Sequence, residues 1–206
     1  MNSATFDCFG LNIHCDPGLN GGGQLFYKQL TLLVNNLKFN NALEMWAGPG
    51  FIGYSLLHLN IVDRITFSDI NSDAMDLCRK TARLNNLDNT SFIISDLFDN
   101  FTDQKFDLII GNPPHYHNNN YRLERLYRGD VSLRAIDNQF SSHKRFFNTV
   151  GQHLSDDGII LLVENIWQMG LSTFQKELDS NGLQIVCHDL LPDFDNLFYM
   201  MISKTN

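Results

Sequence analysis

Short apolar runs alternate with helical patterns through the middle of the chain. Five runs have the length and composition of buried strands, and they cover residues 41–46, 64–67, 91–94, 106–110 and 158–163. Between them, apolar residues recur at helical spacing over residues 51–59, 72–84 and 146–154. Some of the strands, above all 158–163, are apolar throughout, which is typical of parallel strands that helices cover on both faces. The pattern predicts an α/β fold with a mostly parallel sheet. Ser72 and Asp73 are expected to cap the second helix.

The last part of the chain has a different pattern. Residues 183–190 and 197–203 both have strand composition, and only residues 191–196 join them. That connection is too short for a crossover helix, so the two strands are expected to pair in antiparallel fashion. The chain has 206 residues and no linker rich in Pro, Gly or Ser, which predicts a single domain over residues 1–206.

Composition and charge exclude several classes of protein. Hydrophobic residues make up 43% and charged residues 18%, which is typical of a globular chain, and no apolar run is long enough for a membrane span. The net charge of −8 argues against binding nucleic acid through bulk electrostatics. The N-terminus lacks a secretion signal, so a cytoplasmic location is expected. The cysteines, at positions 8, 15, 78 and 187, form no CxxC pair, so they are expected to be small buried residues with reduced thiols, and no metal site is predicted.

A glycine-rich turn follows the first predicted strand of the sheet. Gly48, Gly50 and Gly53 let the backbone turn tightly and let a ligand lie against bare main chain. A nicotinamide dinucleotide could place its pyrophosphate at the start of the following helix, so an oxidoreductase remains an alternative on this motif alone.

Two acids follow the next two strands. Asp69, 21 residues after Gly48, can accept hydrogen bonds from a ribose diol, each contributing about 1.5–3 kcal/mol. Asp96 can bind an exocyclic adenine amine while the Leu97 backbone N–H faces a ring nitrogen. Taken alone, each acid could equally serve a turn or a loop. Together with the glycine turn they predict one cleft at the carboxyl ends of successive strands, where ligands bind in open α/β sheets.

In this ordered set of residues, the stretch 41–163 resembles a class I S-adenosylmethionine-dependent methyltransferase. The segment from Glu44 to Gly50 matches the first motif of that family, Asp69 its ribose acid and Asp96 its adenine-side acid. The resemblance implies a Rossmann-like fold with a mostly parallel seven-stranded sheet and S-adenosylmethionine as cofactor. It implies that the cofactor is bound by Glu44, Trp46, Ala47, Gly48, Gly50, Asp69, Ile70, Asp96, Leu97 and Asn112. Trp46 stands where the family usually has glycine, and its ring is expected under or beside the cofactor.

An Asn-Pro-Pro loop follows the fourth strand. Two prolines stiffen the backbone and have no N–H, so the Pro113 carbonyl is free to point into the cleft, and the Asn112 side chain offers a second acceptor. Two fixed acceptors could hold an –NH2 group by both hydrogens and aim its lone pair at a methyl carbon. Such catalysis is mostly positioning.

The loop resembles the motif of amino-directed methyltransferases, which act on adenine N6, guanine N2 or glutamine N5. The resemblance implies a catalytic loop made of Asn112, Pro113, Pro114 and His115. Most members carry a stacking aromatic residue after the second proline. Here His115 takes that place, and Tyr116 is a candidate replacement for the ring. Neither His115 nor His117 is needed as a base, because solvent can accept the proton, but a proton-accepting role for either remains an alternative.

Two further segments flank the predicted cleft. The insert 116–142 is a candidate lid or substrate reader, and Tyr116, His117, Arg122 and Arg125 are its predicted substrate contacts. A solvated face with local ion pairs is the alternative for this insert. Residues 1–40 are expected to cover the cofactor, with the glycines of residues 15–24 as a flap. No chemistry is assigned to His143, Lys144 or Arg145, which are expected to open the next helix.

The sequence thus favours an S-adenosylmethionine-dependent N-methyltransferase that acts on a planar exocyclic or amide –NH2. Its substrate could be a nucleic acid or a protein, and possible alternatives are a small-molecule amine methyltransferase, a nicotinamide-dependent oxidoreductase and a non-catalytic binding module. The oligomeric state cannot be inferred from these patterns.

Overall fold

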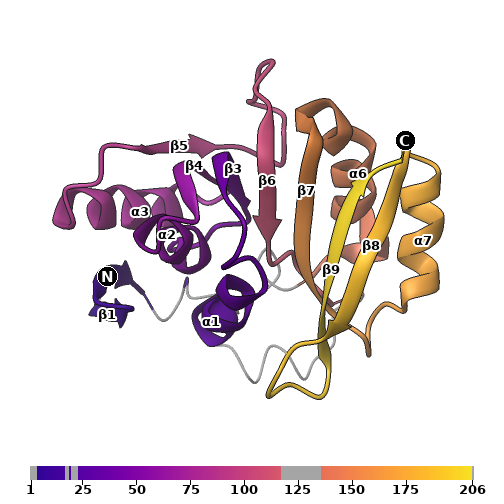
Figure 1. Ribbon diagram of the computed structural model, residues 1–206, viewed down its shortest axis with the longest axis horizontal. Coiled ribbons are helices and arrows are strands. Elements are labelled where there is room, and N and C mark those ends of the chain that lie inside the picture. The colour runs from indigo at the N-terminus through magenta and orange to yellow at the C-terminus, as the bar shows by residue number, and fades with distance from the viewer. Residues whose placement is uncertain (1–3, 17–18, 20–22, 117–135, 206) are drawn as a thin grey trace.

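The computed structural model describes residues 4–16, 19, 23–116 and 136–205, and it contains one large sheet (Figure 1). Its strand order is β5-β4-β3-β6-β7-β9-β8. The parallel strands are β3 (Phe39–Met45), β4 (Val62–Asp69), β5 (Thr90–Ile94), β6 (Phe106–Gly111) and β7 (Leu154–Asn165). The antiparallel strands are β8 (Leu183–Leu190) and β9 (Leu197–Lys204), with β9 beside β7. The predicted seven-stranded sheet and its terminal hairpin are both confirmed.

Helices cover both faces of this sheet. They are α1 (Gly23–Leu33), α2 (Phe51–His58), α3 (Ser72–Leu84), α6 (Ser141–His153), α7 (Leu171–Asp179) and the 3-10 turn η1 (Asn138–Phe140). Side chains that alternate along a strand point to opposite faces. Ala42 therefore packs into the core under α1, α2 and α3, whereas its neighbour Leu43 packs into the core under α6 and α7. Because both faces of the parallel strands are buried, these strands are unbroken apolar runs in the sequence.

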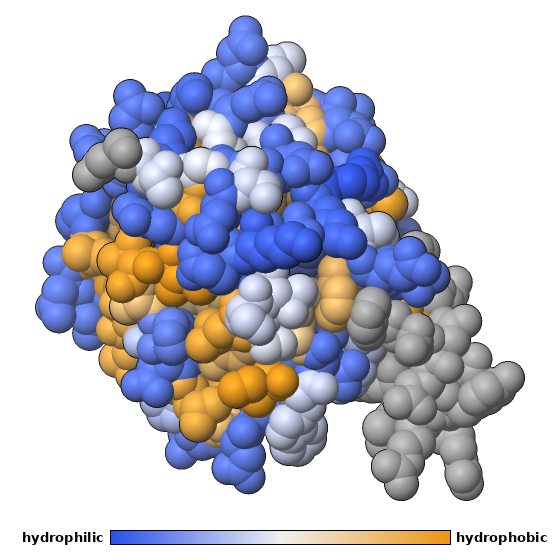
Figure 2. Space-filling view, turned by 90° about the vertical axis from the view of Figure 1, so that its right-hand side faces the viewer, coloured by the Kyte–Doolittle hydropathy of each residue, from blue (hydrophilic) through white to orange (hydrophobic). Residues whose placement is uncertain are grey.

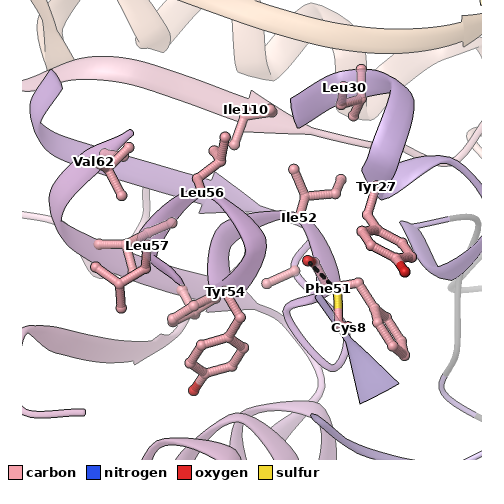
Figure 3. Packing of buried hydrophobic residues seen from close by; sticks show 14 of the residues in the cluster. Cys8, Tyr27, Leu30, Phe51, Ile52, Tyr54, Leu56, Leu57, Val62 and Ile110 are labelled. Atoms are coloured by element: carbon pink, nitrogen blue, oxygen red, sulfur yellow. Dashed lines mark hydrogen bonds between the residues drawn. The ribbon is translucent and has the colours of Figure 1, made fainter. Parts of the chain in front are cut away.

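Helix α2 is the most deeply buried helix. All of its residues except His58 are buried, and Figure 3 shows Phe51, Ile52 and Leu56 packed among residues from several elements. Burial of each such large apolar side chain contributes about 1.5–3 kcal/mol to folding. The first helix after the glycine turn is therefore held rigidly, and so is the turn itself.

An N-terminal hairpin buries the outer side of α2 and was not anticipated. Strand β1 (Ala4–Cys8) pairs with β2 (Leu11–Cys15) in a separate two-stranded sheet. The Cys8 thiol lies 3.0 Å from the Ser55 hydroxyl of α2, and the backbone N–H of His14 donates to the Thr81 hydroxyl of α3 at 2.9 Å. Three of the four cysteines are buried as expected, but Cys187 is exposed on β8, so that part of the expectation is wrong.

Two other boundaries differ from the sequence prediction. The side chain of Asn71, rather than Ser72 or Asp73, caps α3 by accepting the N–H of Asp73 at 2.9 Å. Helix α6 begins at Ser141, just ahead of the residues 143–145 that were expected to open it, and α7 was missed. Only Phe174 and Leu178 of α7 are buried, which is too few apolar positions for a clear helical period.

The sheet ends in an exposed edge strand. Val186 and Leu190 of β8 are exposed, and apolar residues gather on the face that Figure 2 presents. Within the described residues, no helix is both long enough and apolar enough to cross a membrane.

Candidate functional site

A hollow of about 310 Å³ lies at the carboxyl edge of the parallel strands, on the side of the α6 layer. Strands β3 and β6 are neighbours, yet the chain reaches β6 only after building β4 and β5 on the other side of β3. Ligands bind at such a reversal of strand order, because the loops that follow the two strands diverge there. The walls are formed by Met45, Trp46, Asp69, Ile70, Ser95, Asp96, Leu97, Pro114, Ile136, Asp137, Asn138, Ser141, Ser142 and Arg145.

The glycine turn borders this hollow and leads into α2. Gly50 caps the helix with φ 83°, and Gly48 has φ 52°, so both use the left-handed conformation that glycine adopts without strain. A Cβ on Gly48 would lie 3.2 Å from the Leu19 carbonyl oxygen. The backbone at Leu19 therefore lies against the turn, where the flap of residues 15–24 was expected. Residues 17–18 and 20–22 of that flap lie outside the described residues.

Glu44 supports the turn from below. Its carboxylate accepts the backbone N–H of Gly53 at 2.7 Å, and the side chain is buried. Burial raises the pKa of Glu44 to about 8, although hydrogen bonds from Gly53 and Ile52 oppose the shift. Because Glu44 accepts hydrogen bonds from amides in the first turn of α2, it fixes the start of that helix. Glu44 does not line the hollow.

Asp69 joins the first two strand-to-helix turns. One carboxylate oxygen accepts the N–H of Gly48 at 2.8 Å, and the other accepts the N–H of Asn71 at 2.9 Å. Burial raises the pKa of Asp69, and these amides oppose the shift. Each oxygen keeps capacity for a further hydrogen bond, because a carboxylate oxygen has two lone pairs.

Asp96 follows β5, the strand next to β4, and lies beside a cation. Arg145 of α6 donates to Asp96 at 2.7 Å and reaches Asp99 at 3.2 Å. The hydrogen bond to Asp96 raises the pKa of Arg145. Leu97 follows with φ 52° and is buried. The sequence analysis gave Arg145 no chemistry, but the structure places it on the wall of the site.

Trp46 fills the floor of the hollow. Its ring packs against Phe146 with centroids 4.9 Å apart, and its backbone has φ 54°. A Cβ on Gly111 would lie 2.8 Å from both the Met45 carbonyl oxygen and the Trp46 ring. Glycine at the end of β6 therefore makes room for the large ring that directly follows the neighbouring strand β3.

The Asn-Pro-Pro loop leaves β6 directly beside this floor. Pro114 lines the hollow, and Pro113 and Pro114 are both buried. The Asn112 side-chain oxygen Oδ1 is buried and has no hydrogen-bond partner among the described residues. No described residue donates to the Pro113 carbonyl oxygen either. The two acceptors that the sequence predicted thus have no donor within the part of the chain that the structure describes.

A buried cluster of charged side chains lies behind the loop and was missed. His115 Nδ1 lies 3.4 Å from one oxygen of Glu164, at the end of β7, and His143 Nε2 lies 3.1 Å from the other. His143 Nδ1 lies 2.5 Å from Asp137. Although burial alone would lower the pKa of His143, Glu164 and Asp137 raise it to about 9. These residues are far apart in the sequence, so no local spacing could reveal them; a glutamate directly after an apolar strand was the available signal.

The predicted cofactor and substrate residues separate into three groups. The hollow is lined by Trp46, Asp69, Ile70, Asp96, Leu97 and Pro114. Outside this lining, at the end of β3, on the glycine turn or on the Asn-Pro-Pro loop, lie Glu44, Ala47, Gly48, Gly50, Asn112, Pro113 and His115. Of the predicted substrate residues, Tyr116 forms a bridge with Ile136 that brings the two ends of the insert together. His117, Arg122 and Arg125 lie outside the described residues.

A larger hollow of about 560 Å³ lies between α7 and β8. Its lining consists of Leu171, Ser172, Gln175, Ile185, Val186, Cys187 and His188. It contains no carboxylate, and none of the predicted site residues borders it. The acids and the Asn-Pro-Pro loop that the sequence motifs predicted lie at the smaller hollow.

Known proteins support the methyltransferase resemblance that the sequence motifs indicate. Residues 11–127 match the family model of the methyltransferase small domain. The chain belongs to the methyltransferase small domain family. A bifunctional methyltransferase of Rickettsia bellii is 33% identical over 151 residues, covering 69% of this chain and 27% of that protein. A ribosomal protein uL3 glutamine methyltransferase of Francisella tularensis is 29% identical over 195 residues, covering 88% and 62%. The chain thus spans less than two thirds of either relative.

The fold of this methyltransferase small domain also occurs in a solved enzyme. A 16S rRNA guanine N2 methyltransferase of T. thermophilus, in complex with AdoMet and guanosine, superposes with a TM-score of 0.68 at 15% identity. The match covers 100% of this chain and 50% of that one. It confirms the Rossmann-like methyltransferase fold. The residues of this methyltransferase small domain that match the family model include the glycine turn, both acids and the Asn-Pro-Pro loop.

Proposed function

We propose that this protein is an S-adenosylmethionine-dependent N-methyltransferase that acts on a planar exocyclic or amide –NH2 group. One observation carries the proposal: Asn112 holds a buried, unpaired oxygen on a rigid loop at the edge of the hollow. An unpaired buried acceptor costs about 1–3 kcal/mol, and a ligand that supplies the donor would remove this cost. An –NH2 group supplies two donors, and Asn112 and the Pro113 carbonyl offer two acceptors.

The residues of the hollow fit the cofactor. Asp69 has spare acceptor capacity for a ribose diol, Asp96 can accept an adenine amine, and Trp46 and Leu97 give flat apolar walls. A volume of about 310 Å³ lies within the range of small-molecule sites. When bound there, S-adenosylmethionine supplies the activated methyl group.

The chain's own contribution to the reaction is positioning. The Asn112 side chain and the Pro113 carbonyl hold the amine by its hydrogens, which turns the nitrogen lone pair away from conjugation and toward the methyl carbon. The prolines keep this geometry fixed before the substrate arrives. Correct placement of two reactants can contribute up to about 7–11 kcal/mol. The buried loop also limits access of water to the reacting atoms.

We favour a protein amide over an RNA base as the substrate. A net charge of −8 repels a phosphate backbone. Ile166 and Trp167, which directly follow β7 at the carboxyl edge of the sheet, are 43% and 72% exposed and could bury apolar residues of a protein partner. The relatives include a glutamine methyltransferase acting on a ribosomal protein and a methyltransferase acting on 16S rRNA.

Cofactor binding is tested by calorimetry with S-adenosylmethionine. The wild-type protein is expected to bind it, and Asp69→Ala is expected to bind at least tenfold more weakly, because two ribose hydrogen bonds are lost. Asp63→Ala is the matched control, since Asp63 is an exposed acid at the other end of β4. If the wild-type protein shows no binding, the proposal is wrong.

Catalysis is tested with tritiated S-adenosylmethionine and a bacterial cell extract. Methyl transfer is measured separately into protein, RNA and small molecules. Asn112→Ala is expected to keep cofactor affinity and to lose at least 100-fold in turnover, whereas the exposed Asn36→Ala keeps both. Equal loss of affinity and turnover in Asn112→Ala would contradict the positioning role. Label in RNA alone would overturn the preference for a protein substrate.

A further inference from the structure

The buried cluster behind the catalytic loop is linked to the site through His115. The chain of contacts runs from Asp137 through His143 and Glu164 to His115, which directly follows the two prolines. Three of these residues are almost fully buried, and the side chain of His115 is 13% exposed. The cluster is therefore closed to solvent except at its end in the Asn-Pro-Pro loop.

Each member of the cluster is held in place by its neighbours. Asp137 accepts the backbone N–H groups of Ser142 and His143 at 2.8 and 3.1 Å, which fixes it at the start of α6. His143 lies between two carboxylates, and Glu164 divides its two oxygens between His143 and His115. The one ring nitrogen of this cluster without a described partner is Nε2 of His115, and it is not among the buried unpaired atoms.

The cluster has an excess of negative charge. With His143 protonated, Asp137, His143 and Glu164 carry a net charge of −1 in a site closed to water. A proton arriving on His115 neutralises that excess. Burial alone would raise the pKa of Glu164, but His143 and His115 lower it below its usual value. Burial alone would lower the pKa of His143, but Glu164 and Asp137 raise it. The remaining charged residue of α6 at the hollow, Arg145, is ion-paired with Asp96 and Asp99.

We propose that Glu164, His143 and Asp137 are positioning residues that hold His115 with Nδ1–H toward Glu164, so that Nε2 accepts the proton released by the methylated amine. This inference rests on the proposed N-methyltransferase function and adds a proton acceptor to it. A stacking role alone needs only a ring after the prolines. It would not require a carboxylate on one ring nitrogen or a buried imidazolium behind that carboxylate.

The step balances as follows in atoms and charge. The amine lone pair forms the N–C bond while the methyl–sulfur bond breaks and its electron pair stays on sulfur. The nitrogen then carries a positive charge. One of its two N–H groups leaves its acceptor on the loop and turns to Nε2 of His115, where the N–H bond breaks with its electron pair kept by nitrogen. The proton moves to Nε2 of His115, which becomes an imidazolium facing Glu164. His115 then returns the proton to solvent through its exposed edge.

The first test is the pH dependence of turnover, measured as initial tritium transfer to the cell extract between pH 5 and 9. His115→Phe keeps a ring but removes the proton acceptor. It is expected to bind S-adenosylmethionine like the wild type, to lose at least tenfold in turnover and to lose the acidic limb of the pH profile. Glu164→Gln is expected to keep cofactor affinity and to lose turnover, because His115 loses its carboxylate partner. His188→Phe, on the exposed face of β8, is the matched control.

The second test needs neither cofactor nor substrate. Nitrogen-15 NMR of the wild-type protein reports the tautomer of each histidine, with His115 assigned by its absence in His115→Phe. The proposal expects the Nδ1–H form for neutral His115 and a mixed population in Glu164→Gln. It is overturned by an Nε2–H form in the wild type, or by unchanged turnover and pH profile in His115→Phe. A wild type that binds S-adenosylmethionine but transfers no methyl group would overturn the proposed function with it.

Discussion

Replacement of Gly53 by alanine tests whether close packing at the start of α2 keeps the candidate site in shape. The added methyl group would lie 2.5 Å from Cδ1 of Ile65 and 2.6 Å from both Oε2 of Glu44 and Cε1 of Phe67. Overpacking of a rigid core costs about 1–3 kcal/mol. Displacing the buried Glu44 carboxylate from its amide partner costs about 1–3 kcal/mol more. The helical preference for alanine over glycine returns only about 1 kcal/mol. Gly53→Ala should therefore lower the free energy of unfolding by about 1–5 kcal/mol.

The same substitution elsewhere is expected to have the opposite sign. Gly151, near the end of α6, has no heavy atom within 4 Å of its missing Cβ. Gly151→Ala should gain about 0.5–1 kcal/mol from helix propensity alone. Urea denaturation followed by circular dichroism measures both variants against the wild type. If Gly53→Ala is as stable as Gly151→Ala, the close packing around Glu44 described here is incorrect.

Two more predictions concern α6. The pKa of His143 is about 9 in the folded protein and 6.5 unfolded, so its stabilisation is fully present below pH 6.5 and is lost as the pH rises through 9. Relative to His143→Gln, the wild type should lose about 3 kcal/mol of unfolding free energy between pH 6 and 10, and a constant difference would contradict the buried imidazolium. Arg145→Ala should weaken S-adenosylmethionine binding a few-fold in calorimetry by loosening Asp96, with a stability change below about 1 kcal/mol because the ion pair is half exposed. The exposed neighbour Lys144→Ala should change neither quantity, and equal affinities of both variants would exclude a role for Arg145.

Local patterns predicted the parts of the fold whose residues are close in the sequence. The parallel strands, α2, α3 and the C-terminal hairpin follow from apolar runs and connection lengths alone. The glycine turn and Asp69 could be found because each directly follows a predicted strand. The N-terminal hairpin was missed because Asn12 and His14 interrupt a run of only five residues, and its stability comes from contacts with α2 and α3.

The missed part of the site has a different physical origin. Asp137, His143 and Glu164 come from a turn, a helix and a strand, and only the folded chain brings them to His115. A histidine near a helix start has no distinctive spacing, so no local pattern pointed to chemistry at His143. Burial changes the role of His143, because a buried imidazole between two carboxylates carries a fixed charge, unlike a histidine on the surface.

The tryptophan that departs from the family pattern is accommodated by its neighbour in the sheet. Trp46 adopts φ 54°, a conformation that costs a large residue about 1–2 kcal/mol relative to glycine. Packing of its ring on Phe146 offsets this cost, since burying an aromatic ring contributes more than that. The ring fits only because Gly111, paired with Met45 across the sheet, has no side chain. Gly111 is also the last residue before Asn112, so the packing that accepts Trp46 fixes the origin of the Asn-Pro-Pro loop. The floor of the hollow and the proposed amine-binding loop are therefore one packed unit.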